Sequence, residues 1–173
     1  MVEGRLISTV TDLAQQNPLP LEHIVRITRI AVALYPTDYN LLLQRQWILS
    51  LVCSLETIYR PDRVSEGDQN KVTALRDSYL DICGRVLAID DCNAESWYHQ
   101  SCALDHLERY EEAIKSARKA HSIEPTPDTT CQIAHILQSL ERDQEAVRFI
   151  DTSGYTHHPD VQEARRIIVS LME

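Results

Sequence analysis

The hydrophobic positions of this chain recur at steps of three and four residues, and sustained two-residue alternation is nearly absent. That spacing is typical of helices that bury one face, so it predicts an all-α fold of about nine helices. Breakers such as Pro18, Pro36 and Gly154 separate the helical segments. The expected helices cover roughly residues 3–16, 21–35, 38–59, 69–89, 94–107, 110–123, 128–140, 144–152 and 160–172.

The helix expected from Asp38 to Tyr59 is the longest and the most apolar of these segments. Leu42, Trp47, Leu51 and Leu55 belong to an apolar pattern that leaves it little polar surface. A helix that is apolar on most sides is usually buried on most sides. This helix is therefore also a candidate interface, through which the chain would form a homo- or hetero-oligomer.

The charge balance argues against a nucleic-acid partner. The 173 residues include 17 Lys and Arg against 26 Asp and Glu, which gives a formal net charge of −9. Affinity for nucleic acid comes largely from clustered Lys and Arg side chains, and this sequence has no such cluster. The hydrophobic share of 43% and the charged share of 25% are those of a folded globular protein.

Hydropathy and cysteine usage bear on location. No apolar run reaches the roughly 18 residues that a membrane span needs. The five cysteines are an odd number and include no C-x-x-C pair, which favours reduced thiols in a reducing compartment. We therefore expect no membrane span and a cytoplasmic location, with the nucleus as the alternative.

A repeat occupies the second half of the chain. The 34 residues from Ala94 to Pro127 include large and small side chains at spaced positions, namely Trp97, Ser101, Leu104, Tyr110, Ala113, Ala117, Ala120 and Pro125. Small residues let two helices approach closely where they cross, and larger residues then wedge between neighbouring helices. The pattern resembles a tetratricopeptide repeat. A second unit continues the resemblance to Ser153, with Ala134, Leu137 and Ala146 at matching positions.

The resemblance implies antiparallel helical hairpins arranged in a right-handed superhelix. We expect a single domain over residues 1–173, in which residues 1–92 form divergent, longer helices and residues 93–159 form two repeat units. Residues 160–173 would form a capping helix, because an end repeat would otherwise expose an apolar face. Arg165 and Arg166 beside Ile167 and Ile168 give that helix one polar and one apolar side.

In tetratricopeptide arrays the first helix of each pair lines a concave groove, and the resemblance implies that this groove holds a partner polypeptide. The residues expected there are Tyr98, His99, Cys102, Asp105 and His106 on one helix and Cys131, Gln132, His135 and Gln138 on the next. Some relatives clamp a carboxylate at positions that Tyr98 and Cys102 occupy here, and neither side chain can do so. With Asp105 and Glu108 nearby, a basic or aromatic-rich segment is the expected guest.

A metal site is the alternative for part of this set. His99, Cys102 and His106 share one helix face, and Cys131 or His135 could add a ligand from the neighbouring helix. Polar contacts to a peptide explain the same residues without a metal ion. The sequence contains no G-x-S-x-G, glycine-rich phosphate loop or H-E-x-x-H motif. We therefore expect a non-enzymatic adaptor, scaffold or chaperone with no catalytic residue, cofactor or metal ion.

Two other resemblances remain open. The segment Pro36 to Leu49 is similar to the repeat of protein prenyltransferase α subunits, with Tyr39, Asn40, Arg45 and Trp47 at matching types of position. That resemblance implies an α-like subunit of a heteromeric enzyme. The size and acidity of the chain resemble the tetratricopeptide-type chaperones of bacterial type III secretion systems, which hold one apolar partner.

Overall fold

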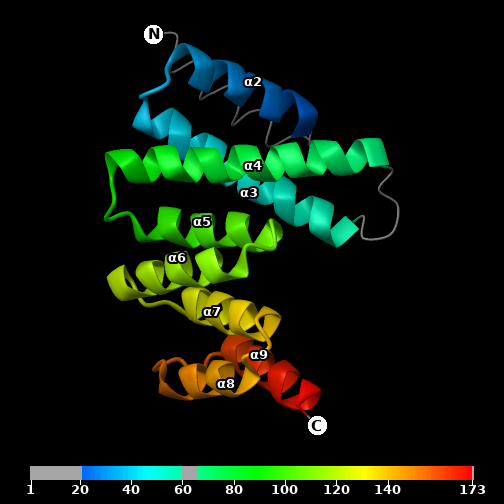
Figure 1. Ribbon diagram of the computed structural model, residues 1–173. Helices are drawn as coiled ribbons and strands as arrows, with labels where there is room; N and C mark the ends of the chain where they lie inside the picture. Colours follow the sequence, from blue (N-terminus) through cyan, green and yellow to red (C-terminus); the bar gives the residue numbers. More distant parts are fainter. Residues whose placement is uncertain (1–20, 60–65, 173) are drawn as a thin grey trace. The chain divides into compact units, whose positions relative to one another are not determined.

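The computed structural model describes residues 21–59 and 66–172, and all regular structure in these residues is helical. The helices are α2 (Leu21–Leu34), α3 (Tyr39–Tyr59), α4 (Glu66–Ile89), α5 (Ala94–His106), α6 (Tyr110–Ile123), α7 (Pro127–Ser139), α8 (Asp143–Thr152) and α9 (Pro159–Leu171). Figure 1 shows their order along the chain. The predicted all-α fold is confirmed, and eight of the nine expected helices are seen. The helix expected at residues 3–16 lies outside the described residues.

The start of α4 differs most from the expected boundaries. The helix begins at Glu66, whereas the sequence predicts a start near residue 69 because Gly67 looks like a breaker. Glycine costs little at a helix start. Helix α4 therefore continues through Gly67, which does not end it.

The chain divides into two compact units, Met1–Ile89 and Asp90–Glu173. Each unit is described by itself below. The expectation that residues 1–173 form a single domain stays a prediction.

In the first unit, α3 packs against both α2 and α4. Leu42, Leu49 and Tyr79 have no exposed surface and form part of the core between these helices. Trp47, by contrast, is 54% exposed, so α3 is less completely covered than its sequence predicts. Its role as an oligomer interface stays a prediction. Although α3 has 21 residues, no described helix has the length and apolarity that crossing a membrane requires.

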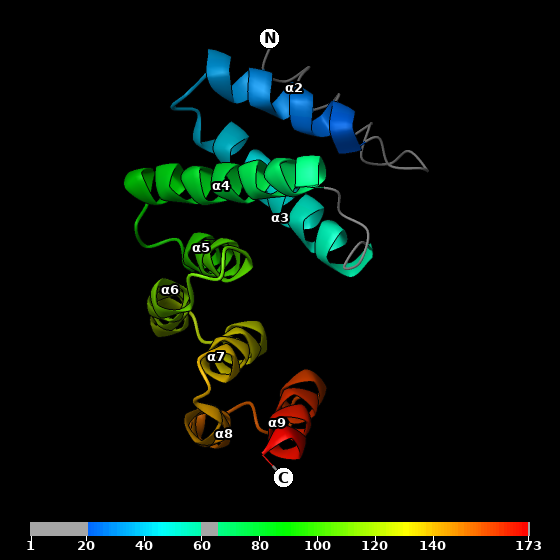
Figure 2. The same ribbon diagram turned by 45° about the vertical axis from the view of Figure 1, so that its right-hand side comes forward.

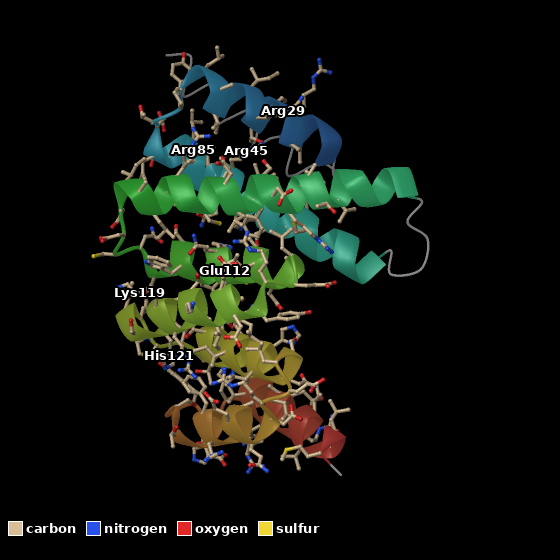
Figure 3. The ribbon with its side chains drawn as sticks, viewed as in Figure 1. Arg29, Arg45, Arg85, Glu112, Lys119 and His121 are labelled. Carbon is tan, nitrogen blue, oxygen red and sulfur yellow. The ribbon has the colours of Figure 1, made fainter. Side chains whose placement is uncertain are left out.

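A buried arginine joins the three described helices of the first unit. Arg45 on α3 is 4% exposed, and its Nη1 donates to the carbonyl oxygen of Val25 at 3.1 Å and to Thr28 Oγ1 at 3.0 Å, both on α2. Its Nη2 donates to Ser78 Oγ on α4 at 3.0 Å. Burial lowers the pKa of Arg45 to about 10, and the nearby positive charge of Arg29 adds to this effect. Figure 3 labels both arginines.

The second unit consists of two helical hairpins followed by α9. Helix α5 pairs with α6 and α7 pairs with α8, while α9 packs against α7 and α8. Figure 2 shows α5, α7 and α9 in one row and α6 and α8 in another. We call these the inner row and the outer row. Alanines with no exposed surface lie in this core, including Ala103, Ala113, Ala117, Ala120, Ala134 and Ala146.

The two hairpins turn in the same way. Glu108 and Glu141, which follow α5 and α7, both adopt a left-handed backbone conformation with φ of 59°. The amide of the next residue donates to a leucine carbonyl at 2.9 Å in each case, Arg109 to Leu104 and Arg142 to Leu137. The internal repeat inferred from side-chain spacing is therefore also present in the backbone.

Candidate partner-binding face

The inner-row helices share a common register when they are counted from their N-caps, which are Asn93, Thr126 and His158. Asn93 Oδ1 accepts the amide of Ser96 at 2.7 Å, and Thr126 Oγ1 accepts the amide of Thr129 at 3.1 Å. Side chains at N-caps fix where a helix begins by satisfying its free amides. The same count therefore identifies equivalent positions on α5, α7 and α9.

Eight of the nine predicted groove residues keep exposed surface in the structure. We call the surface that they form on α5 and α7 the inner face; it consists of Tyr98, Cys102, Asp105, His106, Cys131, Gln132, His135 and Gln138. The ninth, His99, is 8% exposed. Its Nε2 lies 3.7 Å from Glu95 Oε1, and burial lowers the pKa of the imidazole. His99 offers a partner little surface to contact.

Asp105 connects the two helices of the inner face. Its Oδ2 accepts a hydrogen bond from Gln132 Nε2 at 3.3 Å and lies 3.3 Å from His135 Nε2. The Asp105 side chain is 14% exposed, whereas that of His135 is 57% exposed. The hydrogen bond to Asp105 raises the pKa of His135 above its usual value. Among these three residues, His135 is thus the most accessible to a partner.

Tyr98 and two cysteines form a neutral patch beside Asp105. Burial raises the pKa of Tyr98, and its neighbour Cys102 adds to the effect. Burial likewise raises the pKa of Cys102 to about 12 and raises that of Cys131, with a further contribution from Asp160. A thiol nucleophile reacts as the thiolate. These thiols are therefore protonated at neutral pH and behave as small apolar groups.

The structure does not assemble the ligand set of the alternative metal site. In the described part of the chain, one group of three His, Cys, Asp or Glu residues has ligand atoms within 4.8 Å of one another, and it consists of Asp90, Asp91 and Cys92 in an exposed turn. His99, Cys102 and His106 do not form such a group. Their ligand atoms therefore do not all lie within 4.8 Å of one another.

Three further positions belong with the inner face and were missed by the sequence analysis. Asp128 and Asp160 stand at the second position after their N-caps and both raise the pKa of Cys131. Ile167 stands nine residues after its N-cap, as Cys102 and His135 do, and is 45% exposed. Counting from the N-caps would have identified Ile167 from the sequence, whereas the proximity of Asp128 and Asp160 to Cys131 becomes evident only in the structure.

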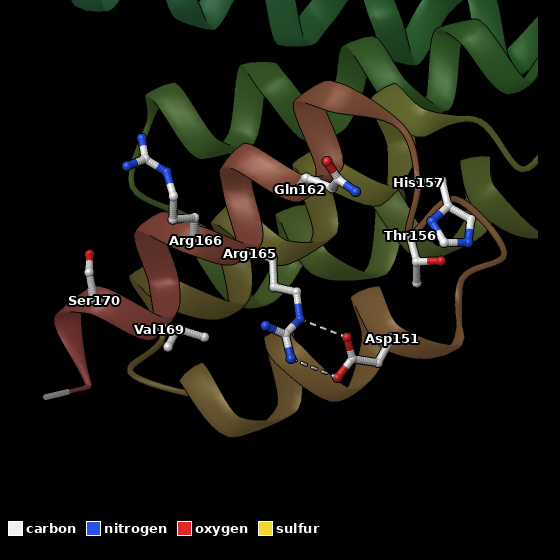
Figure 4. A pocket seen from close by; sticks show the side chains of 8 residues that line it. All are labelled: Asp151, Thr156, His157, Gln162, Arg165, Arg166, Val169 and Ser170. Carbon is white, nitrogen blue, oxygen red and sulfur yellow. Dashed lines mark hydrogen bonds and ion pairs between the residues drawn. The ribbon is translucent and has the colours of Figure 1, made fainter.

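The other side of α9 borders an open hollow of about 650 Å³. Figure 4 shows its lining residues, which are Asp151, Thr156, His157, Gln162, Arg165, Arg166, Val169 and Ser170. Arg165 Nε donates to Asp151 Oδ1 at 2.7 Å, and Arg166 Nη2 donates to Glu163 Oε1 at 2.6 Å. Both arginines of α9 therefore already have carboxylate partners.

A comparison with protein families identifies the repeat. Residues 94–127 match the family model of the tetratricopeptide repeat. This match spans α5, α6 and the start of α7, and it confirms the resemblance found over Ala94 to Pro127. The chain thus carries a tetratricopeptide repeat. No curated protein matches its sequence.

Solved structures of tetratricopeptide-type fold resemble the chain more widely. TTC0263, a thermophilic TPR protein of Thermus thermophilus, aligns with a TM-score of 0.64 and 14% identity over 88% of this chain and 73% of its own. MamA MSR-1 aligns with a TM-score of 0.61 and 15% identity over 83% of this chain and 68% of its own. MamA AMB-1 aligns with a TM-score of 0.60 and 17% identity over 78% of this chain and 68% of its own. At these identities the likeness shows the fold, which is all-helical and TPR-like.

Proposed function

We propose that this protein is a non-enzymatic interaction module that holds a segment of another polypeptide on the inner face. The observation that carries the proposal is the partly exposed row of polar and aromatic side chains along α5 and α7. These side chains lie on helices of a tetratricopeptide-type fold, in which rigid hairpins present an extended surface. This surface supports the role of an adaptor or scaffold, and a cytoplasmic location is part of the proposal.

The chemistry of the inner face favours binding over catalysis. Cys102 is a protonated thiol, because burial raises its pKa to about 12. Asp105 is engaged with Gln132 and His135, so it holds two helices together. A binding surface needs such fixed hydrogen-bonding groups, whereas nucleophilic catalysis needs an activated thiolate.

Helix α9 has the role of a capping helix in this proposal. Positions seven and eight after the N-cap are Ile133 and Ala134 on α7, and both are fully buried. On α9 the same positions are Arg165 and Arg166, which are exposed and line the hollow beside α8. Charged residues at positions that otherwise bury apolar side chains give the end of the inner row a polar surface.

Site-specific photocross-linking tests the proposed binding face. Gln138→p-benzoylphenylalanine places the cross-linker on the inner face, and Lys119→p-benzoylphenylalanine places it on exposed α6 as a matched control (Figure 3). In lysate, we expect the Gln138 variant to capture a defined protein that the Lys119 variant does not capture. Equal capture by both variants, or capture through Lys119 alone, would contradict the proposal.

The narrower alternatives stay predictions. If the protein is a type III secretion chaperone, the same experiment would cross-link it to one apolar translocator protein. A prenyltransferase α-like subunit would instead yield a second enzyme subunit, and prenyl transfer would require both chains.

A further inference from the structure

Helices α5 and α7 of the second unit contain carboxylates but neither Lys nor Arg, whereas α6 and α8 contain charges of both signs. Helices α5 and α7 contain Glu95, Asp105 and Asp128 and neither Lys nor Arg. The outer-row helices α6 and α8 contain Lys115, Arg118, Lys119 and Arg148 together with carboxylates, and α9 of the inner row contains Arg165 and Arg166. The inner face therefore combines carboxylates with neutral side chains. Helices α5 and α7 contribute no Lys or Arg that would neutralise these carboxylates.

Four arginines of the other elements of this unit pair with carboxylates outside the inner face. Arg118 and Arg142 both bind Glu145 at 2.6 Å. On α9, Arg165 and Arg166 bind Asp151 and Glu163. Each of these cations is committed to a carboxylate outside the inner face. Among the described residues, the Asp105 carboxylate accepts from the amide of Gln132 and lies 3.3 Å from the titratable imidazole of His135.

Apolar surface continues the inner face on α9. This helix packs against α7, as α7 packs against α5. Ile167 is at the position of Cys102 and His135, and Leu171 follows one turn later. Ile167 is 45% exposed and Leu171 is 63% exposed. The exposed aliphatic side chains lie on α9 toward its C-terminal end, whereas Asp160 stands in its first turn, so apolar and acidic surface are both offered to a bound segment.

Resting on the proposed function, we infer that the inner face binds a cationic amphipathic segment. Its Lys or Arg side chains lie opposite Asp105 and Asp128, and its apolar side chains contact Ile167. Complementary charge steers the partner and fixes its register. Partial burial strengthens the attraction, because the effective dielectric constant there is lower than in water.

Peptides of defined charge provide the test. Three synthetic peptides of about 14 residues have identical Leu and Ala positions and carry Lys, Gln or Glu at all the others. Their affinity for the full chain is measured by fluorescence anisotropy at about 0.15 M salt, where long-range attraction is screened. The Lys peptide is expected to bind more tightly than the Gln peptide, and the Glu peptide more weakly than both. Equal affinity of the Lys and Gln peptides would overturn the inference.

Two double variants with the same change in net charge locate the binding. D105N/D128N removes two carboxylates of the inner row, and the amide that replaces the Asp105 carboxylate would retain an acceptor for Gln132. E111Q/E124Q removes two exposed carboxylates at the ends of α6. Partly exposed charge pairs predict about a fivefold loss of Lys-peptide affinity for the first variant. The second should lose less than about twofold, and an equal loss in both would overturn the inference, since it indicates general charge attraction.

The cross-linking experiment separates this inference from the proposed function. Capture through Gln138 of a partner whose bound segment lacks Lys and Arg would overturn the inference and leave the proposed function in place. Absence of capture through Gln138 would contradict both. Mapping the cross-linked peptide by mass spectrometry distinguishes the outcomes.

Discussion

The two units of this protein hold their helices together by different means. In the second unit, alanines with no exposed surface, such as Ala113 and Ala120, lie between the helices. In the first unit, the core contains larger side chains such as Tyr79 and includes the buried guanidinium of Arg45. Small side chains let helices pack closely. A guanidinium instead spans between helices and joins them through hydrogen bonds.

This difference shows why one unit carries a recognisable repeat and the other does not. Close packing of two helices constrains residue size at fixed positions, so it leaves a regular pattern of small residues. A buried hydrogen-bonded arginine needs only matching acceptors, which Val25, Thr28 and Ser78 supply here. Such acceptors are too common in sequences to form a signature.

The largest predicted effect follows from overpacking the second unit. Ala120→Leu adds three carbon atoms at a site with no exposed surface, and we expect a loss of about 3 kcal/mol in unfolding free energy. Urea denaturation followed by circular dichroism measures it. Ala88→Leu on the exposed surface of α4 is the matched control and should change stability by less than about 0.5 kcal/mol. A similar small change for Ala120→Leu would show that the packing around this residue has room to spare.

The next effect concerns the polar link of the first unit. Arg45→Met removes three hydrogen bonds but also removes the cost of burying a charge, so we expect a net loss of about 2 kcal/mol. Exposed Arg26→Met on α2 serves as the control. If the hydrogen bonds matter, Thr28→Val and Arg45→Met together should cost less than the sum of the single changes. Strict additivity in this double-mutant cycle would refute the link between Thr28 and Arg45.

The same contrast explains how much the sequence could predict. Bounds of α5 to α9 agree with expectation to within one residue, because caps and breakers such as Asn93 and Pro127 act locally. The interior of the first unit could not be predicted, since Arg45 and Gln46 are polar residues at buried positions. At the candidate site, helical spacing placed His99 among exposed residues. Its burial depends on neighbouring packing, which spacing along a single helix does not specify.

Helix capping should not distinguish the two units. Thr126 forms a capping box with Thr129 at the start of α7, and Asp38 Oδ1 accepts the amide of Leu41 at 2.9 Å at the start of α3. We expect Thr126→Ala and Asp38→Ala each to cost about 1 kcal/mol in unfolding free energy. The two units differ in how their helices pack against one another, which an N-cap does not change. A loss of unfolding free energy in only one of the two variants would show that the units also differ in local helix capping.

The smallest predicted effect is a pH dependence of opposite sign at two histidines of the second unit. His135 has its pKa raised by Asp105, so its stabilising contribution is complete below about pH 6.5 and is lost as the pH rises through the raised value. His121, whose Nδ1 lies 2.9 Å from Thr129 Oγ1, has its pKa lowered by burial. Its contribution is present above about pH 6.5 and is lost as the pH falls.

Unfolding free energies of His135→Gln and His121→Gln, each compared with the unmodified chain at pH 5.5 and 8.5, measure the two contributions. Solvent screens His135, whose side chain is 57% exposed. The loss of unfolding free energy in His135→Gln should therefore be larger at pH 5.5 than at pH 8.5 by only about 0.3 kcal/mol. The His121 substitution should show the opposite trend. Because Asp105 holds α5 to α7 through His135, Asp105→Asn should abolish the first trend and leave the second intact. A pH trend of His135 that survives Asp105→Asn would mean that another group sets its pKa.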